Sequence, residues 1–429
     1  MNDGTPQRRL SRIVITIVLG GGLLAFAIAS TFQFVKWSEL RRFQLGLAHG
    51  EESYQARDFL AESFNAMGFD VFSRLVKSQP GQNVLFSPAG LAEGLAMLAE
   101  GASGSTLGEI AKTMRLDEAH LRNLAASNAV LVSDLAPLDP TLHISIANSL
   151  WVNKDDAIEP SYVSRIQNDF GAQPGSLDIK SPNAPDVVNE WISAQTHGKI
   201  PHLVSGPFDP EFCMMLVNTV YFKGEWINPF DPAMTKDAEF TLLTGETVRC
   251  PQMRRVVDAF HCNNPLFEAV QLMFNDSDYG RFKVNMYVFL PKKTSLFNAF
   301  LNALNTANWK EWQKSFQLLG GTVALPRFKL NAKYDLAKTL QASGIRKAFT
   351  SREANFRPIS SKPLFVADCL QAVSLDVNEQ GAEATSATEI ALSRGRPPET
   401  FSMTVNRPFV VAICSGETIL FIGAITDPR

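Results

Sequence analysis

One stretch of this chain combines the composition of a loop with the periodicity of a strand. From Gly381 to Ser393 the residues are mainly Ala, Ser, Thr and Glu, and none is aromatic. Both acidic residues, Glu383 and Glu389, stand at odd positions, whereas the even positions carry no charge. Because strand side chains alternate between two faces, this pattern is typical of a strand with one buried face. The segment is therefore either a solvated linker or an exposed loop that is able to become a strand.

A cleavable sequence follows this segment directly. Residues Ser393–Pro398 read Ser-Arg-Gly-Arg-Pro-Pro. A basic residue next to glycine at a loop tip is a site where a trypsin-like protease would cut. A protease cleavage site at the end of a loop that can form a strand indicates that this segment takes part in a mechanism and is not merely a spacer.

Short motifs along the chain resemble those of one known family. Asp376–Ala384 resembles the hinge of the reactive-centre loop in the serpin family. Further matches are Asn83–Pro88, Thr196–Ile200, Leu216–Trp226, Leu325–Lys329, Asn406–Phe409 and Phe421–Gly423. Each motif is only modestly specific, but all of them occur in order and at family-like spacing from about residue 53 to the C-terminus. The resemblance implies an α+β, serpin-like fold with a large mixed β-sheet, additional sheets, surrounding helices and an exposed reactive-centre loop.

The resemblance also implies a function. In serpins a serine protease attacks the loop and forms an acyl-enzyme, and the cut loop then inserts into the main sheet and traps the protease. We therefore expect a suicide-substrate inhibitor and not an enzyme. The alternative is a non-inhibitory serpin that acts as a binding or chaperone-like module. Such a protein would usually carry charged or bulky residues on the inward face of its hinge, and this sequence has none there.

The family pattern assigns hinge and reactive-bond residues in this sequence. The hinge residues are Glu379, Gly381, Ala382, Glu383, Ala384, Ser386 and Thr388. When the family's spacing is counted forward from the hinge, the residue before the cleaved bond falls on Gly395, which is an unlikely specificity residue. When the spacing is counted back from Pro408, that residue can fall on Arg394. We therefore predict cleavage between Arg394 and Gly395, which implies a trypsin-like target. The second candidate is Arg396–Pro397, where proline after the bond resists such enzymes.

The resemblance places the region where the main sheet opens at Ser87, Asn218, Gln371 and Trp226. Asn218 lies within a nearly continuous apolar run, and an unpaired buried amide there would cost about 1–3 kcal/mol. Gln371 stands where histidine is common, and Gly90 where serine is usual. Because a glutamine amide both donates and accepts, Ser87, Asn218 and Gln371 could still form a polar cluster.

The N-terminus carries a possible membrane span. Residues 13–35 contain no charged residue and are long enough as a helix to cross the roughly 30 Å hydrocarbon core. Arginines before this run favour a cytoplasmic N-terminus. We expect a cytoplasmic basic tail (1–12), a transmembrane signal-anchor (13–35), a juxtamembrane linker (36–52) and a serpin domain (53–429) with its reactive-centre loop over 380–402. The alternative is a signal peptide cut after Ala27-Ile28-Ala29, which would give a secreted protein. Either way the body would be extracellular or periplasmic.

Composition and motif searches point away from other classes of function. The net charge of −3 gives no general attraction to nucleic acid. The five cysteines lack metal-ligand spacing, so we expect no metal and mostly buried free thiols, although a Cys250–Cys262 bridge stays open. The chain has no HExxH motif, phosphate-binding loop or dinucleotide fingerprint. We expect no cofactor and a monomer whose partners are a trypsin-like serine protease and, through its N-terminal helix, a membrane.

Overall fold

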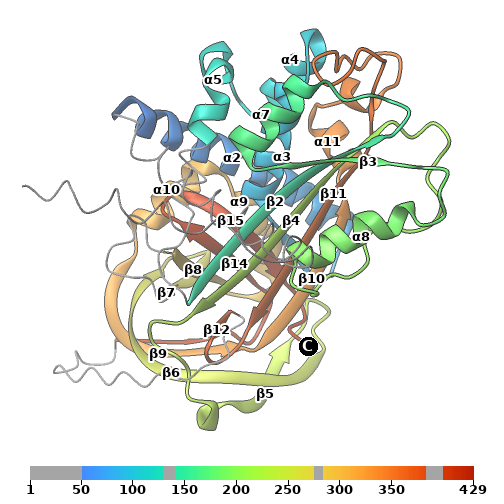
Figure 1. The fold of residues 1–429 in the computed structure, drawn as a ribbon. Coiled ribbons are helices and arrows are strands. Elements are labelled where there is room, and N and C mark those ends of the chain that lie inside the picture. Colours follow the sequence, from blue (N-terminus) through green and yellow to red (C-terminus); the bar gives the residue numbers. More distant parts are fainter. Residues whose placement is uncertain (1–50, 129–140, 275–283, 383–399) are drawn as a thin grey trace, which may run out of the picture.

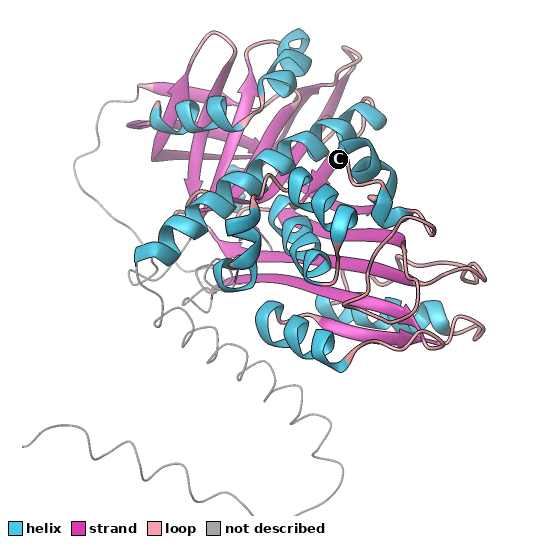
Figure 2. Cartoon of the chain, turned by 90° about the horizontal axis from the view of Figure 1, so that it is seen from above, coloured by secondary structure: helices cyan, strands magenta, loops and turns pink. Residues whose placement is uncertain are grey.

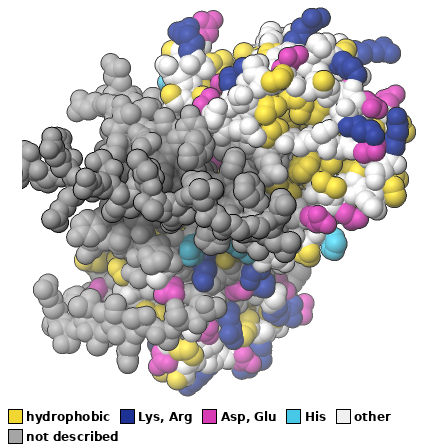
Figure 3. Space-filling view, in the orientation of Figure 1, with side chains coloured by type: hydrophobic (Ala, Val, Ile, Leu, Met, Phe, Trp, Pro, Cys, Tyr) yellow, Lys and Arg dark blue, Asp and Glu magenta, His cyan; other side chains and the backbone are white. Residues whose placement is uncertain are grey.

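The computed structural model describes residues 51–128, 141–274, 284–382 and 400–429, with side chains from residue 58 onward. In this part of the chain two β-sheets pack together over part of their faces, and helices pack against the rest (Figures 1 and 2). The α+β class predicted from the sequence is therefore confirmed. Charged side chains of both signs are spread over the described surface (Figure 3).

The six-stranded sheet has the order β10-β11-β12-β4-β2-β3. Its strands are β10 (Phe328–Asp335), β11 (Val366–Val377), β12 (Gly381–Ala382), β4 (Met214–Glu225), β2 (Leu142–Asn153) and β3 (Gln173–Leu177). The long strands β2, β4 and β11 run side by side across the molecule (Figure 1). Helix α8 (Ala184–Gln195) lies against one face of this sheet, where Trp191 and Val188 join Trp151 and Val217 in an apolar cluster.

The second sheet has nine strands. Its order is β1-β15-β14-β8-β7-β6-β9-β13, and β5 also pairs with β6. The bounds are β1 (Val84–Phe86), β5 (Lys236–Thr241), β6 (Thr247–Asn263), β7 (Phe267–Met273), β8 (Val284–Pro291), β9 (Gln317–Pro326), β13 (Phe401–Thr404), β14 (Phe409–Ser415) and β15 (Thr418–Ile425). The two sheets share an apolar cluster in which Val220 and Val373 of the first meet Val288 and Val411 of the second.

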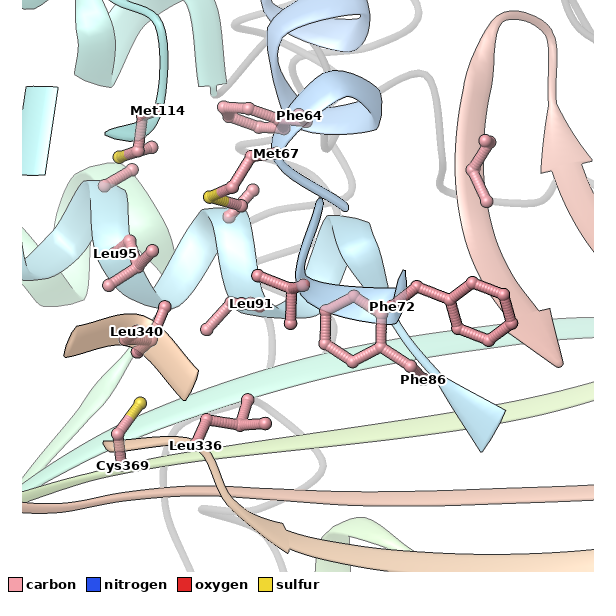
Figure 4. Close-up of a cluster of buried hydrophobic side chains, with 14 of the residues drawn as sticks. Phe64, Met67, Phe72, Phe86, Leu91, Leu95, Met114, Leu336, Leu340 and Cys369 are labelled. Carbon is pink, nitrogen blue, oxygen red and sulfur yellow. The ribbon is translucent and has the colours of Figure 1, made fainter. Parts of the chain in front are cut away.

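Helices cover the remaining core. They are α2 (Glu51–Ser78), α3 (Pro88–Glu100), α4 (Gly104–Thr113), α5 (Glu118–Arg122), α7 (Pro160–Phe170), α9 (Phe297–Ala303), α10 (Thr306–Lys314) and α11 (Ala337–Ser343). Figure 4 shows α2 and α3 directing Phe64, Met67, Leu91 and Leu95 into one buried cluster. The burial of these apolar side chains holds α3 against the six-stranded sheet.

Local sequence signals predict both ends of α3, and only one of them is confirmed. Ser87-Pro88 predicts the start, because serine is a favoured N-cap and proline suits the first helical position. This start is confirmed, since Ser87 Oγ accepts a hydrogen bond from the Gly90 backbone N–H at 3.1 Å. Gly101 predicts a left-handed cap at the other end, which is wrong, since its φ is −99°. Two expected boundaries also shift. Helix α2 begins at Glu51, inside the expected linker, and β13 begins at Phe401, inside the expected loop.

All five cysteines are free, so the possible Cys250–Cys262 bridge is absent. Within the described ranges, no helix combines the length and the apolar character that crossing a bilayer requires. The predicted span at 13–35 and the basic tail at 1–12 lie outside these ranges, so both stay predictions.

Candidate functional site: the seam between β4 and β11

The candidate site is the line along which β4 and β11 pair, which we call the seam. The two strands run parallel and pair directly from Met214 with Val366 to Tyr221 with Ser374. On its outer sides, β11 is bound to β10 and β4 is bound to β2, both in antiparallel ladders. The seam is thus a parallel junction between two antiparallel strand pairs, β10–β11 on one side and β4–β2 on the other.

At one end, which we call the hinge end, the seam already contains a short additional strand. After β11 the chain turns at Asn378, whose backbone N–H donates to Gly381 O at 2.8 Å and whose side chain accepts from the Gln380 N–H at 3.0 Å. Strand β12 then returns between β11 and β4, with Ala382 paired to Val377 and to Gly224. It is antiparallel to both neighbours. Two residues of the predicted hinge therefore occupy the seam.

The close fit of β12 explains its sequence. A Cβ at Gly381 would lie 2.0 Å from Gly224 O and 2.7 Å from Glu225 Cα, so any side chain here would collide with the backbone of β4. Ala382 is fully buried. The space between β11 and β4 therefore accommodates only a glycine followed by a small residue.

Trp226 supports the turn that precedes β12. Its backbone N–H donates to Gln380 O at 2.8 Å, and its indole Nε1 donates to Asn378 O at 3.0 Å. The ring is 3 % exposed and stacks on Phe274, with 4.4 Å between the ring centroids. Trp226 therefore bonds the hinge itself and has no hydrogen bond to the other predicted sheet-opening residues.

Glu379 anchors the hinge through its side chain and its backbone. Its carboxylate accepts a hydrogen bond from Thr235 Oγ1 at 2.8 Å and lies 3.6 Å from Arg327 Nη1. Its carbonyl accepts from the Phe230 N–H at 2.8 Å. The Glu379 side chain is 6 % exposed but that of Arg327 is 47 % exposed, so the ion pair is well screened by solvent.

A cation without an acidic partner lies near this end. Arg255 of β6 stands level with Val323 of β9 and Met403 of β13, on the inward face of the second sheet. Its guanidinium stacks over the Phe230 ring at 4.5 Å, and its Nε and Nη1 are inaccessible to solvent and have no hydrogen-bond partner in the described part of the chain. Burial lowers the pKa of Arg255 to about 9. Sequence patterns gave no signal for this buried charge.

In the middle of the seam, buried polar side chains form a chain of hydrogen bonds across three strands. Gln371 Nε2 donates to Asn218 Oδ1 at 2.9 Å, Asn218 Nδ2 donates to Asn148 Oδ1 at 3.0 Å, and Asn148 Nδ2 donates to Glu93 Oε2 at 3.4 Å. All four side chains are buried. We call this chain, from Gln371 on β11 to Glu93 on α3, the amide relay.

The groups at the two ends of the amide relay impose the same donor-to-acceptor direction on its hydrogen bonds. At one end Ser87 of α3 fixes the glutamine, because the Ser87 N–H donates to Gln371 Oε1 and Ser87 O accepts from Gln371 Nε2, each at 3.0 Å. At the other end Glu93, when ionised, can only accept. Each amide between them must therefore donate toward Glu93. The only side-chain bond of the relay that crosses the seam is the one from Gln371 to Asn218.

The departure from the family pattern at Gly90 has a steric cause. A Cβ at Gly90 would lie 2.5 Å from Asn218 Oδ1 and 2.6 Å from Val220 Cγ2. A Cβ at Gly94, one turn further along α3, would lie 3.0 Å from Asn148 Oδ1. The missing side chains leave room for the relay amides directly beneath α3.

The structure thus brings together three of the four predicted sheet-opening residues. Ser87, Asn218 and Gln371 form the expected cluster, while Trp226 belongs to the hinge end. Sequence reasoning missed Asn148 and Glu93, although a signal was available: each is a polar residue within a run that otherwise reads as buried strand or helix. The hinge residues beyond Ala382 and the candidate reactive bonds lie outside the described residues, namely Glu383, Ala384, Ser386, Thr388, Arg394, Gly395, Arg396 and Pro397. In the described ranges no cluster of three or more His, Cys, Asp or Glu residues is arranged to hold a metal ion.

The fold and the seam together define a class of protein whose main sheet carries a short additional strand at one end of the junction between two parallel strands. A family model described as "Serpin (serine protease inhibitor)" matches residues 62–428. The chain belongs to the serpin family. Proteins of this family are in general inhibitors of serine proteases and not catalysts.

Individual relatives agree with this assignment. The chain is 26 % identical over 401 residues to serpin B10 of Bos taurus, covering 86 % of this chain and 100 % of that protein. It is 30 % identical over 389 residues to glia-derived nexin of Homo sapiens, covering 86 % and 94 % respectively.

Solved structures share the fold. Human thyroxine-binding globulin complexed with its ligand superposes with a TM-score of 0.79 at 24 % identity, covering 87 % of this chain and 100 % of that chain. Native protease nexin-1 with heparin superposes with a TM-score of 0.76 at 27 % identity, with the same coverage. At such identity the likeness to thyroxine-binding globulin establishes the fold alone.

Proposed function

We propose that this protein is a suicide-substrate inhibitor of trypsin-like serine proteases and has no catalytic activity of its own. The observation that carries the proposal is β12, because it shows the hinge already paired antiparallel to both strands of the seam. After cleavage, the loop would extend β12 along the seam and carry the acylated protease with it.

The register of β12 supports this extension. Ala382 pairs with Gly224 and Val377, so a strand continued six residues further in the same register brings Thr388 level with Asn218 and Gln371. The side chain of Thr388 would then point to the same face as these amides. Insertion must break the Gln371–Asn218 hydrogen bond, and a threonine hydroxyl can replace it because it both donates and accepts.

The energetics favour insertion once the loop is cut. The inserted strand exchanges one parallel interface for two antiparallel ones, a net gain on the order of ten hydrogen bonds at about 1 kcal/mol each. Ile390 and Leu392 share the uncharged face of the loop and would add about 1.5–3 kcal/mol each if fully buried. No charged side chain on that face opposes the process.

The bond that we propose for cleavage is Arg394–Gly395, with Arg396–Pro397 as the second candidate. The test mixes the full chain with trypsin and follows the products on a denaturing gel. A complex that resists SDS, together with a released C-terminal fragment that begins at Gly395, supports the proposal. Simple turnover of the loop without a complex contradicts it, and a fragment with another start refutes the bond assignment.

A single substitution tests insertion separately from recognition. Ala384→Arg leaves the candidate bond intact but places a charge on the inward face, which costs several kcal/mol when buried. The variant is expected to be cleaved as fast as the parent yet to form little complex. The matched control is Thr385→Arg, on the opposite face, which should keep far more complex. Equal complex formation by both variants would contradict the inserted register.

The second candidate function is a non-inhibitory serpin that acts as a binding or chaperone-like module. Both functions use the same fold, so the discriminating measurement is thermal unfolding before and after loop cleavage. An inhibitor gains a strand and should become much more resistant to heat. An unchanged midpoint after confirmed cleavage would favour the binding module.

We also propose that residues 13–35 act as a transmembrane signal-anchor, that the protein is a monomer, and that its body lies outside the cytoplasm. The uncharged run and the preceding arginines support this topology. Alkaline carbonate extraction of membranes from cells that express the full chain tests it. Retention in the membrane pellet is expected, and release of a shortened soluble chain would favour the signal-peptide alternative.

A further inference from the structure

A hollow of about 710 Å³ lies where α2, α4 and the end of α11 meet. It is separate from the seam, and none of its lining residues belongs to the hinge or the amide relay. The three helices lie at the same end of the molecule (Figure 1). Its charged lining residues are Asp70, Arg74, Glu109, Lys112, Arg115 and Arg346. Four cations thus face two acids.

Both acids are already engaged by the protein. Asp70 Oδ2 accepts hydrogen bonds from Arg74 Nε at 2.9 Å and from Ser343 Oγ at 2.7 Å. Although burial alone would raise the pKa of Asp70, these hydrogen bonds and the charges of Arg74 and Arg115 lower it. Glu109 Oε2 accepts from the backbone N–H groups of Arg346 and Lys347, each at 2.8 Å. The two carboxylates therefore tie α2 and α4 to the chain around the end of α11.

Three cations remain without an acidic partner. Among the residues that the structure describes, the side chains of Lys112, Arg115 and Arg346 have no ion pair and no hydrogen-bond acceptor. Arg115 also has a φ of 59°, a left-handed conformation that is uncommon for a residue with a side chain. Backbone hydrogen bonds on both sides hold it there, from Arg115 N to Lys112 O at 3.1 Å and from Leu116 N to Ala111 O at 2.9 Å. The Arg115 position is therefore fixed.

The helix dipole accounts for only part of this charge. Lys112 lies in the last turn of α4, where a cation offsets the partial negative charge of the helix end. The carbonyls of Ile110, Ala111 and Lys112 already accept backbone hydrogen bonds. Arg115 and Arg346 lie beyond the ends of α4 and α11, where this effect fades. Because the side chains of Arg115 and Arg346 line the same hollow, we look for an anionic ligand as their partner.

We propose that this hollow binds a soluble multivalent oxyanion of the diphosphate or phosphate-ester class. Guanidinium groups bind phosphate oxygens in a bidentate manner, and a lysine adds a compact charge. The hollow falls within the roughly 300–1,000 Å³ of ordinary small-ligand sites. Because the anion would bridge three helices, its binding would stabilise the folded protein by mass action. The proposal does not depend on the inhibitory function.

The experiment titrates the full chain with sodium pyrophosphate by isothermal calorimetry at constant ionic strength. We expect saturable binding of one anion per chain and a rise in the thermal unfolding midpoint, neither of which sodium chloride should reproduce. The test variant combines Arg115→Gly with Arg346→Ala, because glycine suits the left-handed backbone and removes the cation without strain. The variant should bind at least about tenfold more weakly, since charged hydrogen bonds contribute about 1.5–3 kcal/mol each.

The matched control combines Arg254→Ala with Lys338→Ala, which removes the same charge from exposed positions outside the hollow. An equal loss of affinity in the control would show that binding depends on the overall charge of the protein, and it would contradict the proposed site. Absence of saturable binding to the parent chain would overturn it as well. Should the double variant fail to fold, Lys112→Gln replaces it, because this side chain is exposed and lies at a helix end.

Discussion

The two ends of the same seam are built on opposite principles. At the hinge end the seam is open by two residues and is filled by backbone: β12 pairs with both neighbours, and the glycine at position 381 makes this close approach possible. In the middle the seam is closed and is joined by side chains of the amide relay. If the cut loop inserts as proposed, it needs no separate initiation step, because a strand nucleus is already present at the hinge end. The remaining barrier lies where buried amides must exchange partners.

The largest effect is expected in the middle of the seam. Asn218→Leu removes the central member of the amide relay and leaves buried groups of Gln371 and Asn148 unpaired. At about 1–3 kcal/mol for each of the two groups, the uncleaved protein should lose about 2–6 kcal/mol of unfolding free energy, measured as a lower urea midpoint. The matched control is Asn331→Leu on β10, where the exposed amide accepts from Ser374 Oγ and should matter far less. Equal losses of unfolding free energy in the two variants would mean that the amide relay gives the middle of the seam no special stability.

The next effect concerns the hinge end. Gly381→Val collides with the backbone of β4 and should expel β12, which forfeits about 2–3 kcal/mol from its few ladder hydrogen bonds. Hydrogen exchange of the Ala382 amide and of the Trp226 amide, which donates to Gln380 O, would report the expulsion directly. Gly108→Val, at an exposed position of α4 where a Cβ meets no neighbouring atom and φ is not positive, controls for the entropy of replacing glycine. Hinge amides that stay protected in the Gly381→Val variant would contradict the close-approach argument.

Near the same end, one substitution should stabilise the protein. Arg255→Met keeps the length of the side chain and its contact with Phe230 but removes a buried cation that has no counter-charge among the described residues. Replacing a buried ion with an apolar residue of similar size should raise the unfolding free energy by about 1–2 kcal/mol. The urea midpoint should rise accordingly. A loss of stability would mean that Arg255 has a favourable partner in the folded chain.

The smallest effect is expected from the hinge ion pair. Arg327→Ala removes a half-exposed cation at 3.6 Å from Glu379 and should cost no more than about 1 kcal/mol. Thr235→Val removes the 2.8 Å hydrogen bond to the same buried carboxylate and should cost more, because it leaves a charged acceptor short of a partner. If raising the salt concentration to about 1 M failed to shrink the Arg327 effect, the screening argument would be wrong.

Much of the scaffold was predictable from local patterns, and part of the site was too. Ser87-Pro88 marks the start of α3 without ambiguity, and the apolar run around Asn218 identifies a buried strand with one polar residue. The direction of the amide relay was not predictable, because it depends on the backbone of Ser87 and the carboxylate of Glu93, which lie far apart in sequence from Asn218. The burial of Arg255 was hidden for the same reason: it depends on which face of β6 turns inward after an irregular stretch. Gly101 shows the opposite error: a local rule predicts a left-handed cap, but its φ is −99°, and a Cβ there would lie 2.4 Å from Ile359 Cγ1, so close packing is the reason that this position needs glycine.

The contacts of α3 have a mechanical consequence for the sheet. Ser87 joins the helix to β11 through Gln371 and to β15 through Leu420, so the start of the helix is fixed to one half of the molecule. Where the helix crosses the other half, Gly90 and Gly94 leave room for Asn218 and Asn148, and Glu93 between them binds Asn148 Nδ2. If the halves part as the proposed insertion requires, a helix that moves with β11 must give up this single hydrogen bond to β2, and the two glycines present no side chain that would block the shift.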